Sequence, residues 1–186
     1  MTTHILIDGE NIDTTLGNII LGGRRPTSQE RPRWEKVLSF VEREFGGINP
    51  LFFLNVKKDG IDPRFLSALI AMRITPIQVS GEESEKVVDI AILKTLRALA
   101  KNPAKQSDNV VLISCDSDFA DAISELLNGR RKVAVIAFNE FISNAFRTLD
   151  AKGIKIFDLE NDIGAFTFKL PRNRIMPLAT FDPNQF

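Results

Sequence analysis

The sequence predicts an α/β fold, a three-layer α/β/α sandwich with a mainly parallel central sheet. Short apolar runs alternate with segments whose apolar residues recur near every 3.6 positions, which is typical of strands alternating with helices. Most of the runs are apolar on both faces, as strands of a parallel sheet are when helices cover both sides. Right-handed crossovers between such strands then produce the three layers.

Six strands and five helices follow from this pattern. We expect the strands at residues 4–7, 51–56, 75–79, 109–114, 132–138 and 154–159. We expect the helices at residues 33–47, 62–73, 85–101, 117–129 and 141–153. Three of these helical segments end in glycine, the preferred residue just past a helix. In such sheets ligands bind outside the carboxyl ends of the strands, so functional residues should gather there.

The chain is expected to form one domain with a tail. Its 186 residues, 44% hydrophobic and 26% charged, are enough for one ordinary domain with a sizeable core. We assign residues 1–165 to the domain and residues 166–186, where prolines are frequent and periodicity is absent, to an extended C-terminal tail. Residues 22–32 are expected to form a mobile basic loop.

Composition excludes several classes of protein. The 24 basic and 24 acidic residues cancel, so a nucleic acid would have to meet a local basic patch. Cys115 is the only cysteine, which rules out an internal disulfide and fits a reducing compartment. The N-terminal segment lacks the basic start of a signal peptide, and no run approaches ~18 apolar residues. We therefore expect a cytoplasmic protein with no membrane partner.

Four aspartates are expected at the carboxyl edge of the sheet. Asp8 ends the first strand, and Asp116 and Asp118 follow the strand at 109–114. Asp89 lies near the start of its helix on the apolar face, where a buried charge needs a partner. Each acid alone has a structural explanation, as a turn former, a helix cap or half of an ion pair.

Together these four carboxylates predict a site for a divalent cation. They would repel one another at one edge of the sheet unless a cation lay among them, and oxygen ligands suit Mg²⁺ or Mn²⁺. A structural zinc site is not expected, because the chain has one histidine and one cysteine. Such a cluster supports phosphoryl transfer, in which metal ions activate a water without a protein nucleophile.

Three motifs in this order resemble those of the NYN domain, a branch of the PIN-like metal-dependent ribonucleases. They are DGEN at residues 8–11, KVVD at 86–89 and SCDSDF at 114–119, and the resemblance covers roughly residues 3–160. It implies hydrolysis of RNA phosphodiester bonds with a set of metal-binding and catalytic acids, namely Asp8, Asp89, Asp116 and Asp118. It also implies substrate contacts, which would come from Asn11, Ser117 and Lys86.

The chain departs from the family pattern at three positions. Val87 and Cys115 stand where relatives commonly carry glycine, and Thr95 stands where many carry a further acid. The change at Thr95 bears on a second metal site and leaves the core of four acids in place.

We therefore expect a Mg²⁺- or Mn²⁺-dependent ribonuclease whose partner is single-stranded or structured RNA. Cations near the acidic edge would contact the phosphates, and the candidates are Arg24, Arg25, Arg31, Arg33, Lys57 and Lys58. The alternative is a regulatory RNA- or protein-binding NYN module with weak or no catalysis, which Thr95 keeps open. A homodimer and a protein partner for the tail also stay open. A Toprim-type nuclease and a haloacid dehalogenase-type phosphatase fit less well, because Glu10 is poorly suited to either pattern.

Overall fold

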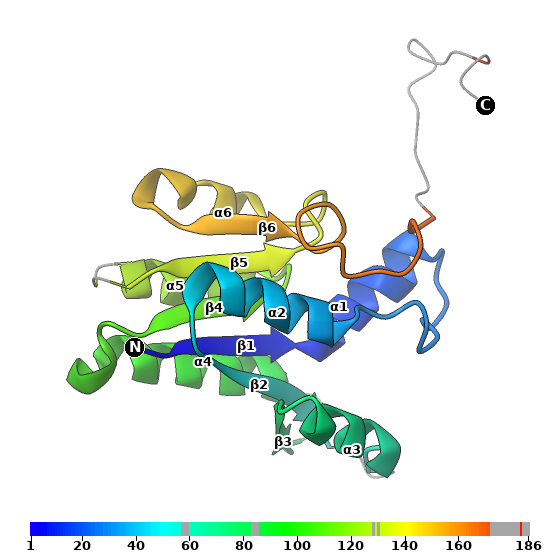
Figure 1. The fold of residues 1–186 in the computed structure, drawn as a ribbon, viewed down its shortest axis with the longest axis horizontal. Coiled ribbons are helices and arrows are strands. Elements are labelled where there is room, and N and C mark those ends of the chain that lie inside the picture. Colours follow the sequence, from blue (N-terminus) through cyan, green and yellow to red (C-terminus); the bar gives the residue numbers. More distant parts are fainter. Residues whose placement is uncertain (57–59, 83–85, 128, 130, 172–182, 184–186) are drawn as a thin grey trace.

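The computed structural model describes residues 1–56, 60–82, 86–127, 129, 131–171 and 183, and everything below concerns these residues. Six strands form one sheet in the order β3-β2-β1-β4-β5-β6 (Figure 1). They are β1 (Thr3–Asp8), β2 (Ile48–Asn55), β3 (Thr75–Val79), β4 (Asn109–Ile113), β5 (Val133–Ala137) and β6 (Lys155–Asp158). Each neighbouring pair is parallel, which confirms the predicted sheet.

Helices cover both faces of this sheet. They are α1 (Gly9–Thr14), α2 (Trp34–Phe45), α3 (Pro63–Ala71), α4 (Val87–Lys101), α5 (Ala120–Leu127) and α6 (Asn144–Arg147). In Figure 1 α2 lies in front of the sheet, and α4 and α5 lie behind it, where they pack on each other. On the front face, Phe40 of α2 packs edge-on against Phe157 of β6, with ring centroids 5.0 Å apart. The predicted three-layer sandwich is therefore confirmed.

The strand order reverses between β1 and β4. From β1 the chain builds outward to β2 and β3, and then it crosses back through α4 to β4 and builds outward to β5 and β6. Every residue of β1, β4 and β5 is buried, as expected for central parallel strands. In a sheet of this kind the crevice for a ligand opens outside the carboxyl ends of the two strands at the reversal.

The sequence prediction missed a helix directly after β1. Residues 9–14 form α1, which continues as a π-helical segment at Thr15–Ile20. Ile12, Leu16 and Ile20 are buried along one side, four residues apart, so the apolar period was present. Two glycines and a pair of threonines, all weak helix formers, hid it.

The helix predicted at residues 141–153 is wrong in extent. The structure has the four-residue α6 followed by a 3-10 turn at Asp150–Lys152. The Ser143 side chain caps α6 by accepting from the Ala145 N–H, which starts the helix later than predicted. The apolar residues Ile142, Phe146 and Leu149 are buried with near-helical spacing even though the segment is broken.

The chain after β6 returns to the domain. Phe166 stacks on Phe138 with centroids 5.9 Å apart, and Leu170 is 2% exposed. Phe166 and Leu170 of the predicted tail thus pack against the domain, and residues 167–169 between them are exposed. Residues 172–182 and 184–186 lie outside the described part of the chain. None of the described helices is long and apolar enough to cross a membrane.

Gly9 fixes the exit of the chain from β1. A Cβ atom at this position would lie 2.2 Å from Cε1 of Phe52 on the neighbouring strand. The Phe52 ring cannot move aside easily, because it packs edge-on against both Trp34 and Phe65. The glycine of the DGEN motif therefore has a steric role in this chain.

We predict that Gly9→Ala lowers the free energy of unfolding by about 1–3 kcal/mol, because the added methyl group overpacks the Phe52 cluster. Gly47→Ala is the matched control, since a Cβ there meets no atom within 4 Å. Urea denaturation of both variants checks the prediction. Equal midpoints for Gly9→Ala and the wild type would contradict it.

Candidate metal centre

The pairing of β1 with β4 brings the first functional residues together. Ile7 pairs with Ile113, so Asp8 and Ser114 follow at the carboxyl ends of adjacent strands. The buried Ser114 hydroxyl donates to Asp8 Oδ2 at 3.1 Å and accepts from the Asp116 N–H at 3.2 Å. One serine side chain therefore connects the two strand ends.

Helix α4 and the turn after β4 supply a cluster of three carboxylates. Asp89 lies in the first turn of α4, and Asp116 caps the 3-10 turn Ser117–Phe119 by accepting from the Asp118 N–H at 3.0 Å. One carboxylate oxygen from each of Asp89, Asp116 and Asp118 lies within 4.8 Å of the others. The Asp116 cap gives this aspartate a local structural role, and the convergence with Asp89 is a separate feature.

Asp8 lies deeper than these three acids and is 2% exposed. Its carboxylate accepts from the Asn11 N–H at 3.1 Å as well as from Ser114. Burial raises the pKa of Asp8 to about 6, with added repulsion from Asp89 and Asp116, although both hydrogen bonds favour the charged form. Burial also raises the pKa of Asp89, an effect that the ammonium of Lys86 opposes. The protein thus holds carboxylates where their charge is costly.

Lys86 supplies the positive charge beside the cluster. Its Nζ lies 3.2 Å from Asp118 Oδ2 and 3.6 Å from Asp89 Oδ2. A hydrogen bond to Asp118 raises the pKa of this exposed lysine, and the charges of Asp118, Asp89 and Asp116 add to the rise. An ammonium therefore occupies part of the field in which a cation would bind.

The donor set fits a hard divalent cation. All the converging atoms are carboxylate oxygens, the ligand type that Mg²⁺ and Mn²⁺ take, and Asp89 and Asp116 are only partly exposed. Asp89, Asp116 and Asp118 are the residues that could hold such an ion directly, and Asp8 lies behind them.

Of the other predicted site residues, Asn11 takes a structural position and Ser117 is exposed. The Asn11 side chain accepts from the Cys115 N–H at 2.8 Å, which ties α1 to the loop after β4. Ser117 is exposed at the start of the 3-10 turn. Thr95 donates its hydroxyl hydrogen to the Ala91 carbonyl at 2.8 Å, so this hydroxyl is used within α4.

The predicted basic patch is partly neutralised within the domain. Arg24 forms an ion pair with Glu30, and Arg31 pairs with Asp13 at 2.7 Å. Arg25 is exposed in the same loop. Lys57 and Lys58 lie outside the described residues.

Sequence reasoning missed Ser114. A serine that continues a wholly apolar strand was the available signal, because a buried hydroxyl needs hydrogen-bond partners. Its partner Asp8 lies at the end of β1, far away in the sequence, and periodicity alone cannot identify such a contact.

We predict that Asp8→Asn stabilises the cation-free protein at pH 7.5 by up to about 3 kcal/mol. The pKa of Asp8 is about 6 in the folded protein and 3.8 in the unfolded chain, so between these pH values the folded wild type binds more protons than the unfolded chain. Its stability should therefore fall as the pH rises from about 4 to 6, and the variant should lack this loss. Denaturation in chelator at pH 4 and 7.5 measures the effect, with Asp121→Asn as control. Parallel pH profiles for wild type and Asp8→Asn would refute the burial penalty.

We predict that Lys86→Gln tightens Mn²⁺ binding about threefold, because a cation that takes the carboxylates must displace the ammonium. Lys94→Gln, an exposed lysine on the same helix, should leave the affinity unchanged. Isothermal titration calorimetry of both variants compares the two dissociation constants. Weaker binding in Lys86→Gln would show that the lysine supports the ion instead.

Comparison with known proteins identifies the family. The model of the family described as the NYN domain matches residues 2–156, which is most of the chain. No curated protein matches this sequence. The matched segment includes all four aspartates and the whole sheet apart from the last two residues of β6. The chain therefore belongs to the NYN domain family.

Proposed function

We propose that the protein is a metal-dependent ribonuclease that hydrolyses RNA phosphodiester bonds. The observation that carries this proposal is the convergence of Asp89, Asp116 and Asp118 at the carboxyl edge of an NYN domain, with the buried Asp8 behind them. Caps and ion pairs with Lys86 explain single acids, but they do not explain why the acids converge at an energetic cost, which is typical of functional sites. NYN domains are generally nuclease-like, and this supports the reaction class.

The residues of the site have distinct roles in this proposal. Bound Mg²⁺ or Mn²⁺ would supply Lewis acidity and lower the pKa of a water molecule near the scissile phosphate. Asp89, Asp116 and Asp118 hold the ion, while Ser114 and Asn11 keep the two strand ends in register. Lys86, exposed beside the cluster, would contact a phosphate oxygen of the RNA.

RNA is the proposed partner, and phosphate contacts would supply most of its affinity. Arg25 is an exposed arginine of the loop between α1 and α2, and its exposed neighbour Arg24 already has an acidic partner in Glu30. A cytoplasmic location also belongs to the proposal. The buried thiol of Cys115, whose pKa burial raises, is compatible with it and is not expected to react.

The second candidate is a regulatory NYN module that binds RNA or protein without turnover. Two features favour it. The Lys86 ammonium offsets part of the negative charge of the carboxylates, and Thr95, whose hydroxyl is bonded within α4, supplies no charge for a second cation. Cation binding in calorimetry, together with intact RNA after prolonged incubation, would select this candidate.

We predict that the purified protein cleaves single-stranded RNA with Mn²⁺ and that Asp116→Asn lowers kcat/KM by about 100-fold or more. Asp121→Asn, an exposed aspartate in the first turn of α5, is the matched control and should keep full activity. Chelator should abolish cleavage by the wild type and by Asp121→Asn. Equal activity of Asp116→Asn and the wild type would exclude the proposed centre.

A further inference from the structure

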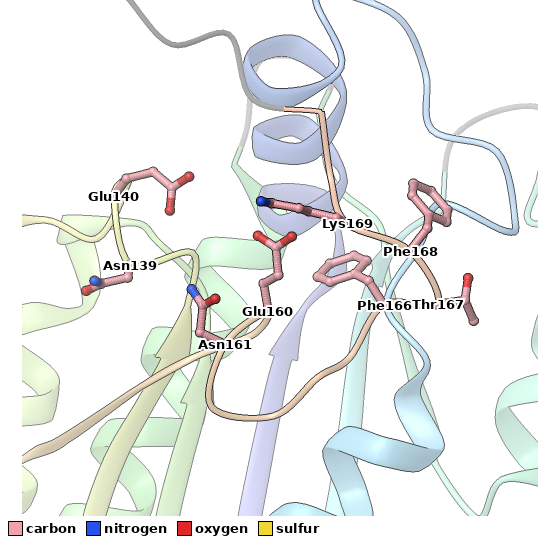
Figure 2. A pocket seen from close by; sticks show the side chains of 8 residues that line it. All are labelled: Asn139, Glu140, Glu160, Asn161, Phe166, Thr167, Phe168 and Lys169. Carbon is pink, nitrogen blue, oxygen red and sulfur yellow. The ribbon is translucent and has the colours of Figure 1, made fainter. Parts of the chain in front are cut away.

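A pocket of about 580 Å³ opens on the carboxyl edge of the sheet beside the metal centre (Figure 2). Two loops line it, one after β5 with Asn139 and Glu140 and one after β6 with Glu160 and Asn161. The third wall is the segment 166–169. Because β4 and β6 are two strands apart, the pocket lies on the order of 10 Å from the loop that carries Asp116.

The segment after β6 supplies most of the residues that line this pocket. We call residues 159–170 the strap, because in Figure 1 this segment runs from the end of β6 across the edge of the sheet toward α1. Hydrogen bonds hold both its ends, from the Leu159 N–H to the Ala137 carbonyl and from the Leu170 N–H to Glu160 Oε1. The Arg33 N–H also donates to the Ala165 carbonyl at 2.7 Å. The family match ends at residue 156, so the strap is not part of the matched segment.

Asp158 holds the backbone of Asn139 and the amide side chain of Asn161, two residues that line the pocket. Its buried carboxylate accepts from the Asn139 N–H at 2.7 Å and from Asn161 Nδ2 at 2.9 Å. Asn139 Oδ1 in turn accepts from Arg147 Nη2 at 3.1 Å. Among the described residues these contacts leave Asn139 Nδ2 as a donor and Asn161 Oδ1 as an acceptor, which are the kinds of group that hydrogen-bond nucleobases.

The aromatic ring of Phe166 and the charges of the lining residues also favour a nucleobase. Figure 2 shows Phe166, Glu160 and Lys169 directed toward one another, whereas Phe168 and Thr167 point away from Glu160. Phe166 already stacks on Phe138, so its ring is held in place as a platform. Glu140 and Glu160 outnumber Lys169, so the lining disfavours a phosphate. Carboxylates do accept hydrogen bonds from the amino groups of bases.

We propose that this pocket binds one nucleobase of the RNA strand whose scissile phosphate lies at the metal centre. The inference rests on the proposed ribonuclease function and adds a substrate-recognition site to it. Asn139 and Asn161 contact the edge of the base, Phe166 packs against its face, and the strap keeps the base at a fixed distance from the carboxylate cluster. Single-stranded RNA is then the substrate class, because a base-paired nucleotide cannot present this edge.

The test compares two diesters and two variants. Asn139→Asp has the same shape but replaces the Nδ2 donor with an acceptor, and Asn102→Asp adds the same charge at the other end of α4 as control. Cleavage of a single-stranded RNA is measured beside hydrolysis of bis(p-nitrophenyl) phosphate, a diester without a base. We expect Asn139→Asp to raise KM for RNA about tenfold and to leave the base-free diester unaffected.

Abasic RNAs locate the base and separate the possible failures. In the wild type one abasic position near the cleavage site should cause the same loss, and Asn139→Asp should add nothing to it. Phe166→Leu should behave like Asn139→Asp at the same position. If Asn139→Asp had the same KM for RNA as Asn102→Asp, or lost equal activity on both diesters, the proposed base pocket would be overturned. The proposed ribonuclease function would stand.

Wild-type protein that cleaves neither diester would overturn the proposed function instead. Fluorescence anisotropy with the same labelled RNAs then still decides the pocket, through the same abasic position and the same variants. A third outcome would assign the pocket to a protein partner. In that outcome the protein binds a lysine- and arginine-rich peptide tightly, Asn139→Asp alters this binding, and the affinity for RNA does not depend on the abasic position.

Discussion

The pairing of β1 with β4 is the constraint on which the rest of the structure depends. These two central strands are fully buried, and the chain builds outward from them on both sides. Their parallel register sets Asp8 beside the turn that carries Asp116 and Asp118, and Ser114 joins the two ends with two hydrogen bonds. Helix α4, which crosses from β3 back to β4, then brings Asp89 to the same point. The carboxylate cluster is therefore a consequence of the topology.

Electrostatics distinguishes this edge from an ordinary stable surface. Burial and neighbouring acids raise the pKa of Asp8 and of Asp89, so folding places negative charge where it is disfavoured. The exposed Lys86 ammonium offsets part of this cost at Asp89. Hydrogen bonds from Ser114 and the Asn11 N–H offset part of it at the buried Asp8. A divalent cation would relieve the remainder. The same edge continues past β5 to the strap, where hydrogen bonds to Asp158 hold neutral amides beside the charged centre.

Much of this could be predicted from the sequence. The alternation of apolar runs with helical segments predicted the sheet, and the positions of Asp8, Asp89 and the DSD triplet predicted where the acids lie. Periodicity failed at residues 9–20, where weak helix formers masked a buried stripe, and at 141–153, where the Ser143 cap delayed the helix. Ser114, the Arg24–Glu30 pair and the strap depend on contacts between residues whose pairing the sequence pattern does not encode.

Anomalous diffraction from a crystal soaked in Mn²⁺ tests the central claim most directly. The account predicts a peak about 2.0–2.2 Å from carboxylate oxygens of Asp89, Asp116 and Asp118, with the Lys86 ammonium displaced from its present position between Asp89 and Asp118. A second anomalous peak near Asp8 would show a further ion. No peak at the cluster at millimolar Mn²⁺, with Lys86 still bridging the carboxylates, would contradict the account.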